Sequence, residues 1–145
     1  MEIRTEVQID ASAPDVWRVL TDFDEYPAWN PFIRTIRGSL VKGAKLEVEI
    51  QPPGRRPIRF NPTVLNVTPE RELRWIGHLK LPGLLDGEHV FEIEPTGPRS
   101  VRFVQRERFI GIAVLAMRWL LQKSTIAGFE DMNEALKARA EALSA

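Results

Sequence analysis

His89 and Glu107 are the two side chains of this chain whose types and spacing could perform acid–base chemistry. Each lies in a segment where apolar and charged residues alternate, and the turn residues Pro95–Pro98 separate the two segments. If the turn closes a hairpin with Glu94 opposite Arg102, then His89 lies opposite Glu107 on the inward face. We expect the carboxylate to raise the imidazole pKa and to hold one tautomer, as a general base or a polar ligand anchor requires. A structural pair that only satisfies its own hydrogen bonds would show the same spacing.

The same register places Phe91 opposite Gln105, with Trp75 beside them on the preceding strand. A shift of two residues would place His89 opposite Gln105 instead. The outward faces of the two strands carry glutamates against arginines. Their predicted cross-strand ion pairs are Glu94–Arg102 and Glu88–Arg108. Because the glutamates neutralise the interleaved arginines, this face does not indicate nucleic-acid binding.

The segment 79–87 contains four leucines, which is unusual for a loop. It could fold down as part of the core, or act as a hinged lid over a cavity mouth with Gly83 and Gly87 as hinges. A membrane or dimer contact is the third alternative. The lid residues of this hypothesis are Leu81, Pro82, Leu84 and Leu85.

The last third of the chain, from Gly111 to Leu143, has the pattern of one long helix. From Gln122 onward it is amphipathic, and the predicted buried face consists of Ile126, Phe129, Met132, Asn133, Leu136, Ala140 and Leu143. The earlier half is apolar nearly all round, broken only by Arg118, and it is too short to span a membrane. We therefore expect several sides of this half to be covered. Arg118 could reach a ligand carboxylate or extend to solvent.

Two short helices and about six further strands complete the expected fold. Residues 2–10 alternate as a half-buried strand does, and Ser12 with Asp15 resembles a capping box at the start of a short helix. A second short helix should end near Trp29, because Pro31 disfavours helical geometry in the residue before it. Consecutive strands with short turns predict an antiparallel meander covered by the terminal helix.

The apolar residues Ile58 and Phe60 occupy even positions, whereas Leu65 and Val67 occupy odd ones, with Asn61-Pro62 between them. Such a change indicates a bulge or a bend, which makes a sheet curve. The sequence therefore predicts a single α+β domain over residues 1–145, in the order β-α-α-β6-α, with a curved antiparallel sheet of about seven strands wrapped on the long C-terminal helix.

Composition excludes several other kinds of site. The 145 residues include no cysteine, and 20 basic side chains balance 20 acidic ones, so bulk charge favours neither nucleic acid nor an anionic membrane. No glycine-rich phosphate loop or nucleophile elbow is present, and His78 and His89 fit no zinc spacing. We expect no metal, no cofactor and no stable membrane insertion. The N-terminus lacks the apolar core of a signal peptide, which favours the cytoplasm.

Several motifs resemble the helix-grip superfamily, which contains START lipid-transfer domains, pollen-allergen-type proteins and polyketide cyclase/dehydrase-like proteins. The matching segments span essentially the whole chain: residues 13–17, 22–31, 69–75, 87–91 and 106–111. The resemblance is to the bacterial cyclase-like branch in particular. It implies an apolar cavity between a seven-stranded sheet and the C-terminal helix. Members of the superfamily bind lipids, sterols or aromatic polyketides, and only some of them catalyse a reaction.

Binding of a hydrophobic small molecule is the leading functional hypothesis. The residues expected around the ligand are Trp29, Phe32, Val48, Trp75, His89, Phe91, Gln105, Glu107, Phe109, Leu115, Arg118 and Trp119. One alternative is a cyclase- or dehydratase-type enzyme in which His89 or Glu107 moves a proton beside a carbonyl. The other is a protein-interaction or stress-associated domain, acting as a monomer or weak homodimer with Leu81–Leu85 as a contact surface.

Overall fold

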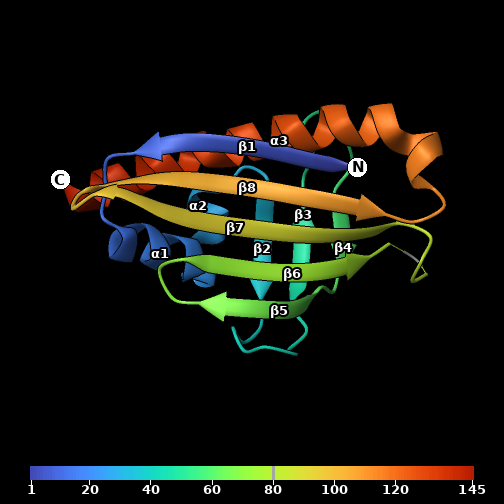
Figure 1. Cartoon of the computed structure of the whole chain (residues 1–145), viewed down its shortest axis with the longest axis horizontal. Coiled ribbons are helices and arrows are strands. Elements are labelled where there is room, and N and C mark those ends of the chain that lie inside the picture. The colour runs from blue at the N-terminus through green and yellow to red at the C-terminus, as the bar shows by residue number, and fades with distance from the viewer. Residues whose placement is uncertain (80) are drawn as a thin grey trace.

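The computed structural model describes residues 1–79 and 81–145, and it shows a long C-terminal helix lying along a curved antiparallel sheet (Figure 1). The predicted α+β class and helix-grip architecture are confirmed. In chain order the elements are β1 (Glu2–Ile9), α1 (Ala13–Thr21), the 3₁₀ helix η1 (Phe23–Glu25), α2 (Tyr26–Trp29), β2 (Ile33–Arg37), β3 (Glu47–Ile50), β4 (Ile58–Phe60), β5 (Thr63–Thr68), β6 (Glu72–His78), β7 (Asp86–Gly97), β8 (Ser100–Ile110) and α3 (Val114–Ser144).

The described residues form eight strands in two sheets, one more than the sequence pattern indicated. Five strands follow the order β1-β8-β7-β6-β5, and three follow the order β2-β3-β4. In Figure 1 the three shorter strands cross steeply behind the long ones. A single bridge between Lys45 and Thr63 joins the sheets, supported by the backbone hydrogen bond from Leu46 N to Pro62 O (2.9 Å).

The change of apolar parity near Pro62 marks the point where the chain passes from one sheet to the other. Pro62 lies between β4 and β5, where a missing N–H breaks no ladder within a strand. A second irregularity follows between Val64 and Asn66, where the register of β5 against β6 shifts. Val64, on the N-terminal side of this shift, lies opposite Trp75, and both side chains are buried.

Both predicted short helices are present with the expected ends. The Ser12 hydroxyl accepts a hydrogen bond from the backbone N–H of Asp15 (3.3 Å), so Ser12 is the N-cap of α1. α2 ends at Trp29, and Asn30 before Pro31 is extended. The buried Asn30 side chain then accepts hydrogen bonds from the backbone N–H groups of Phe32 and Ile33 (2.9 and 2.8 Å). These bonds fix the direction in which the chain enters β2.

The second half of α3 packs on the inward face of the large sheet as its amphipathic pattern predicts. Gly128, Phe129, Met132, Asn133, Leu136 and Ala140 are buried, while Leu143 at the helix end is largely exposed. Gly128 is required here because a Cβ at this position would lie closer than 3.0 Å to the ring of Phe32. Phe32 itself packs edge-to-face on Phe129, with ring centroids 5.9 Å apart. Phe32 and α3 thus approach each other closely.

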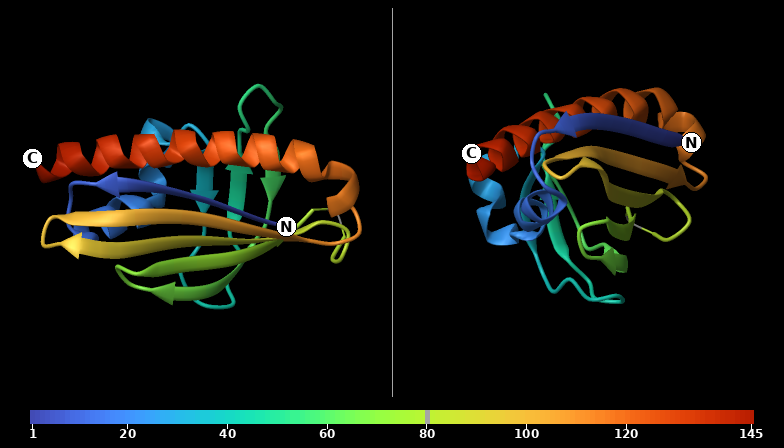
Figure 2. Two further views of the ribbon diagram at one scale, coloured as in Figure 1. Left: turned by 45° about the horizontal axis from the view of Figure 1, so that its top comes forward. Right: turned by 60° about the vertical axis from the view of Figure 1, so that its left-hand side comes forward.

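The first half of α3, which we expected to be covered on several sides, leaves part of its apolar surface exposed in the described chain. Met117, Leu120 and Leu121 face inward, but Leu115 and Trp119 are 83% and 73% exposed. Figure 2 shows this end of α3 beside the loop that follows β6. None of the described helices is long and apolar enough to cross a membrane.

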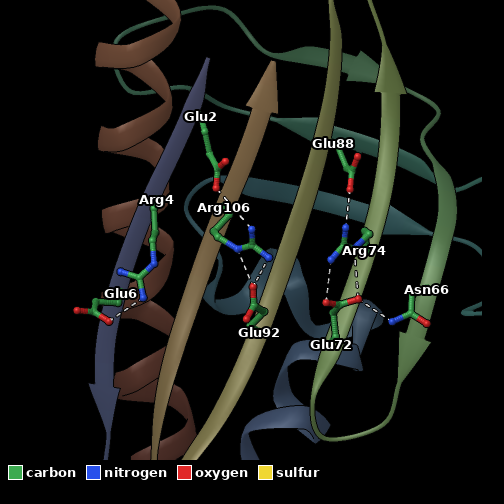
Figure 3. Close-up of polar contacts among 9 residues, drawn as sticks. All are labelled: Glu2, Arg4, Glu6, Asn66, Glu72, Arg74, Glu88, Glu92 and Arg106. Atoms are coloured by element: carbon green, nitrogen blue, oxygen red, sulfur yellow. Dashed lines mark hydrogen bonds and ion pairs between the residues drawn. The ribbon is translucent and has the colours of Figure 1, made fainter. Parts of the chain in front are cut away.

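The outward face of the large sheet carries a network of ion pairs (Figure 3). Arg74 bridges Glu72 and Glu88, at 3.1 and 2.7 Å. The predicted pair Glu94–Arg102 is confirmed at 3.2 Å. Glu88 lies opposite Arg108 in the register as predicted, but its carboxylate binds Arg74 on the other neighbouring strand instead. These side chains are partly solvated, so each pair contributes only a few tenths of a kcal/mol up to about 1.

Candidate functional site

A cavity of about 230 Å³ lies between the first half of α3 and the concave side of the two sheets. Its wall is almost entirely apolar. The main contributors are Phe32, Ile50, Ile58, Phe60, Trp75, Leu79, Leu85, Phe109, Met117, Leu120, Leu121 and Phe129, with His89 and Glu107 as the polar groups of the inner wall. Arg55 and His78 also line it and are exposed, so the cavity reaches the surface at these residues.

Two glycines on adjacent strands make part of this space. Gly77 and Gly87 lie opposite each other in β6 and β7, and both line the cavity. A Cβ on Gly77 would lie 3.0 Å from the Phe60 ring, and a Cβ on Gly87 would lie closer than 3.0 Å to the Glu107 carboxyl group. The carboxyl group therefore occupies room that any other residue at position 87 would fill. A glycine inside a strand indicates close approach of this kind, and this signal was available in the sequence.

His89 and Glu107 lie opposite each other in β7 and β8, which confirms the predicted register. The distance from His89 Nδ1 to Glu107 Oε2 is 3.1 Å. The imidazole is enclosed by aromatic rings: it stacks on Phe91 at 4.2 Å between centroids, and contacts Trp75 (5.3 Å) and Phe129 (4.8 Å). Only 7% of the His89 side chain and 13% of the Glu107 side chain are exposed.

A chain of buried hydrogen bonds fixes the tautomer of His89. Gln105 Nε2 donates to Asn133 Oδ1 in α3 (2.6 Å), and Asn133 Nδ2 donates to Thr5 Oγ1 in β1 (3.0 Å). Gln105 Oε1 is then left as an acceptor, and it lies 3.0 Å from His89 Nε2. Nε2 therefore carries the proton, and the lone pair of Nδ1 faces Glu107.

Burial makes both members of the pair electrically neutral. It lowers the pKa of His89 to about 3, against a smaller opposing effect of the hydrogen bond to Gln105. Burial, together with the negative charge of Glu88, raises the pKa of Glu107 to about 8. The expectation that the carboxylate raises the imidazole pKa is therefore wrong, because the cost of desolvation dominates. A protonated carboxyl group opposite a neutral imidazole remains.

Glu107 Oε2 is a buried polar atom whose hydrogen bonding is incomplete. It lies close to Nδ1 of His89 but is not aligned with it well enough for a hydrogen bond. A buried polar group without a partner costs free energy, and such groups recur at functional sites. Glu107 lines the cavity, and its carboxyl group is thus a polar group of the inner wall with unused hydrogen-bonding capacity.

The structure brings some of the residues expected at the ligand to the cavity and places others elsewhere. Phe32, Trp75, His89, Glu107 and Phe109 line the cavity. The remaining predicted residues fall into three groups. Phe91, Gln105 and Val48 are buried behind the wall, Trp29 packs on Tyr26, and Leu115, Arg118 and Trp119 lie on the outer side of α3.

The residues predicted for α3 differ from those that line the cavity, because the first half of this helix is apolar nearly all round. Met117, Leu121 and Thr125 line the cavity, while the neighbouring Leu115 and Trp119 do not. These three residues precede Phe129 in steps of four. Extending the buried face backward from Phe129 would have selected them.

The loop after β6 contacts the segment that leads into α3. Gly83 O and Leu84 O accept hydrogen bonds from the backbone N–H groups of Ile112 and Ala113 (3.2 and 2.9 Å). Leu85 is buried and lines the cavity, whereas Leu81 is 67% exposed and Pro82 is also exposed. Lys80, within the leucine-rich segment, lies outside the described residues.

Asp86 ties the end of this loop to β6. Its Oδ1 lies 2.7 Å from His78 Nδ1, and both carboxylate oxygens accept from the backbone N–H of Gly83 (3.2 Å). The pKa of Asp86 is lowered, mainly by the hydrogen bond with His78. Among the described residues, no group of three or more His, Cys, Asp or Glu side chains is placed to hold a metal ion.

The fold is similar to those of several solved proteins. A START superfamily protein from Mycobacterium smegmatis is 21% identical, with a TM-score of 0.77 over 98% of each chain. The Zhui aromatase/cyclase from Streptomyces sp. R1128 is 15% identical, with a TM-score of 0.80 over 97% of this chain and 93% of the other. Norcoclaurine synthase from Thalictrum flavum is 19% identical, with a TM-score of 0.72 over 100% and 96%. At these identities the likeness shows the fold alone.

No curated protein sequence matches the chain. A family model does match it, over residues 1–141, and its description is "Polyketide cyclase / dehydrase and lipid transport". The match covers both sheets and nearly all of α3, including every residue of the cavity wall. The chain therefore belongs to the polyketide cyclase/dehydrase and lipid transport family.

Proposed function

We propose that this protein binds a hydrophobic small molecule, of lipid, aromatic or polyketide-like character, in the cavity between α3 and the sheet. The observation that carries the proposal is an apolar space of about 230 Å³ that the side chains leave unfilled. Because the cavity reaches the surface at Arg55 and His78, water can enter it, and contact between water and this apolar wall is unfavourable. A bound apolar molecule displaces that water and contacts the wall directly.

The wall supports a ligand with an aromatic or extended apolar body and a hydrogen-bonding group. Trp75, Phe60 and Phe109 offer ring surfaces, and the neutral Glu107 carboxyl group offers a hydrogen-bond partner beside them. A protonated carboxyl group can donate to a carbonyl or hydroxyl oxygen, which an ionised one cannot do. The names of two fold neighbours, an aromatase/cyclase and norcoclaurine synthase, are consistent with ligands of this kind.

We also propose that residues 81–85 act as a lid. Leu85 closes one side of the cavity, and two backbone hydrogen bonds attach the loop to the start of α3. Gly83 has a positive φ of 87°, which gives the loop a hinge position that favours glycine. Breaking the two bonds would release Leu85 and open a route between the loop and α3.

The test compares two tryptophan substitutions in the same helix. Leu121→Trp introduces a large ring into the cavity, whereas Leu115→Trp adds the same ring on the exposed side of α3. Native mass spectra would detect co-purifying small molecules, and thermal-shift measurements would screen fatty acids, sterols and polyphenols. A ligand at 100 times its dissociation constant should stabilise the wild type by about 2.7 kcal/mol. Binding should be lost in Leu121→Trp and retained in Leu115→Trp; equal binding to both variants would contradict the proposal.

Acid–base catalysis is the second candidate, and the raised pKa of Glu107 in the cavity wall is the observation that favours it. A carboxyl group with a pKa of about 8 can exchange a proton near neutral pH. The experiment incubates the wild type and Glu107→Gln with a bound ketone or polyketide in D₂O. Deuterium uptake beside the carbonyl in the wild type alone would support catalysis. A ligand that binds and takes up no deuterium would argue for binding without chemistry.

A further inference from the structure

A second, open groove adjoins the cavity along the outside of α3. It runs between α3 and the loop at residues 51–57 that joins β3 to β4. Four residues line both the cavity and the groove: Arg55, Ile58, Leu120 and Ser124. Because the two spaces share these walls, one molecule can occupy both, with one end buried and the other end near solvent.

The charged residues that line this groove are all basic. They are Arg55, Arg56 and Lys123, and the other lining residues carry no charge. The chain as a whole is neutral, with 20 basic and 20 acidic side chains, so three cations without an acidic residue in one groove are a local asymmetry. The pattern continues along α3, where Arg118 and Lys123 are the only charged residues between positions 109 and 129.

These cations are available to a ligand. In the part of the chain that the structure describes, Arg4, Arg59, Arg74, Arg102, Arg106 and Lys137, among others, are paired with carboxylates, but no ion pair involves Arg55, Arg56 or Lys123. The backbone at Arg55 is held in place, since its N–H donates to Pro52 O (3.0 Å) and its carbonyl accepts from Gln51. Lys123 Nζ lies 5.2 Å from the centre of the exposed Trp119 ring, which positions the ammonium group at the groove.

We infer that the ligand is an anionic amphiphile whose apolar body fills the cavity and whose carboxylate or phosphate lies in the groove against Arg55, Arg56 and Lys123. This inference rests on the proposed binding function and specifies its ligand class. The deep end of the cavity offers only neutral polar groups, at His89 and Glu107, so an anion has no partner there. At the mouth, two planar guanidinium groups can each donate two parallel hydrogen bonds to oxygens of a carboxylate or phosphate.

The experiment measures the affinity of three probes with the same ten-carbon chain: decanoate, decyl phosphate and 1-decanol. Titration calorimetry is run at pH 7.5 and low salt. The proteins are the wild type, the double variant Arg55→Gln/Arg56→Gln, Lys123→Gln, and Arg99→Gln as a control for an exposed arginine in the β7–β8 turn, away from the groove. Decanoate and decyl phosphate distinguish a free fatty acid from a phosphate head group.

We expect the better anionic probe to bind about tenfold or more tightly than 1-decanol, since hydrogen bonds to charged groups are stronger than those to a neutral hydroxyl. The double variant should remove most of this advantage, mainly by weakening the anionic probe, and added salt should weaken the anionic probe alone. Equal affinity for the alcohol and both anions, or an advantage that survives in the double variant, would overturn the inference and leave the binding function standing. If none of the three probes binds, the inference fails. The proposed binding of a ligand with an extended apolar body would then be contradicted as well.

Discussion

His89 Nδ1 and Glu107 Oε2 lie 3.1 Å apart across β7 and β8, and both groups are neutral because burial opposes their charges. The same distance would also be compatible with an ion pair between a charged imidazole and a carboxylate. In this site the rings of Phe91, Trp75 and Phe129 replace the water that would stabilise an ion pair. The result is a contact between two neutral polar groups. An uncharged ligand group can hydrogen-bond there without breaking an ion pair.

The pH dependence of stability tests this neutral pair. The pKa of Glu107 is raised from 4.5 to about 8, so its contribution is full below about pH 4.5 and is lost as the pH rises through 8. The pKa of His89 is lowered from 6.5 to about 3, so its contribution is present above about pH 6.5 and is lost as the pH falls through 3. Between pH 4.5 and 6.5 the two slopes oppose each other, and we expect the highest stability there.

The variant Glu107→Gln keeps the shape of the protonated carboxyl group but cannot ionise. Between pH 6.5 and 8, the free energy of unfolding of the wild type should fall relative to this variant by about 1.4 kcal/mol per pH unit. Urea unfolding at pH 5.5, 7.0 and 8.5 measures the difference. Parallel pH profiles for the two proteins would show that Glu107 is ionised in the folded state at neutral pH.

Gly87→Ala should destabilise the protein through Glu107. A Cβ at position 87 would lie closer than 3.0 Å to the carboxyl group, and such overpacking costs about 1–3 kcal/mol. In the background of Glu107→Ala the obstacle is removed, so the same substitution should cost less or stabilise slightly. A double-mutant cycle from urea unfolding measures the coupling energy. A value near zero would mean that the strand adapts to the methyl group in some other way.

Gly128→Ala tests the close approach of α3 and Phe32. In an exposed helix this substitution stabilises by about 1 kcal/mol, because alanine is the better helix former. Here the new methyl group would overlap the Phe32 ring, so we expect destabilisation by about 1–3 kcal/mol. Replacing Phe32 by leucine in the same protein should restore part of the loss. Stabilisation by Gly128→Ala alone would show that the ring moves aside freely.

Asp86→Ala should loosen the proposed lid. The substitution removes the contact with His78 and the acceptor for the Gly83 N–H. Hydrogen exchange at the amides of Gly83, Ile112 and Ala113 should then become several-fold faster, because the loop opens more often without these contacts. Asp131→Ala, at an exposed position of α3, serves as the control. Unchanged exchange at all three amides would indicate that the loop is held without Asp86.

The fold could be predicted because each strand of the large sheet has one buried face. The alternation around His89 and Gln105, combined with one turn at Pro95–Pro98, predicted the register of β7 against β8 that the structure shows, although the pattern alone left a shift of two residues open. The separation of β4 from β5 was less accessible, since a change of parity at Pro62 is compatible with a bend as well as with a change of sheet.

The cavity was harder to predict, because its position depends on which face of an all-apolar segment turns inward. Leu115 and Leu121 are equivalent by residue type, and only the continuation of the stripe from Phe129 distinguishes them. The charge state of His89 was also beyond the sequence pattern. The direction of the His89 pKa shift depends on how completely the neighbouring rings exclude water, which is a property of the packed structure.

The location of a bound ligand tests the central claim most directly. Leucine methyl groups report on it by NMR, since Leu79, Leu85, Leu120 and Leu121 line the cavity, Leu136 is in the core and Leu115 is on the surface. During titration with fatty acids, sterols and polyphenols in turn, at least one compound should shift the four cavity leucines saturably and leave Leu136 and Leu115 in place. If every compound leaves the cavity methyl groups unchanged, or shifts only the surface leucines, then the space between α3 and the sheet is not a binding site.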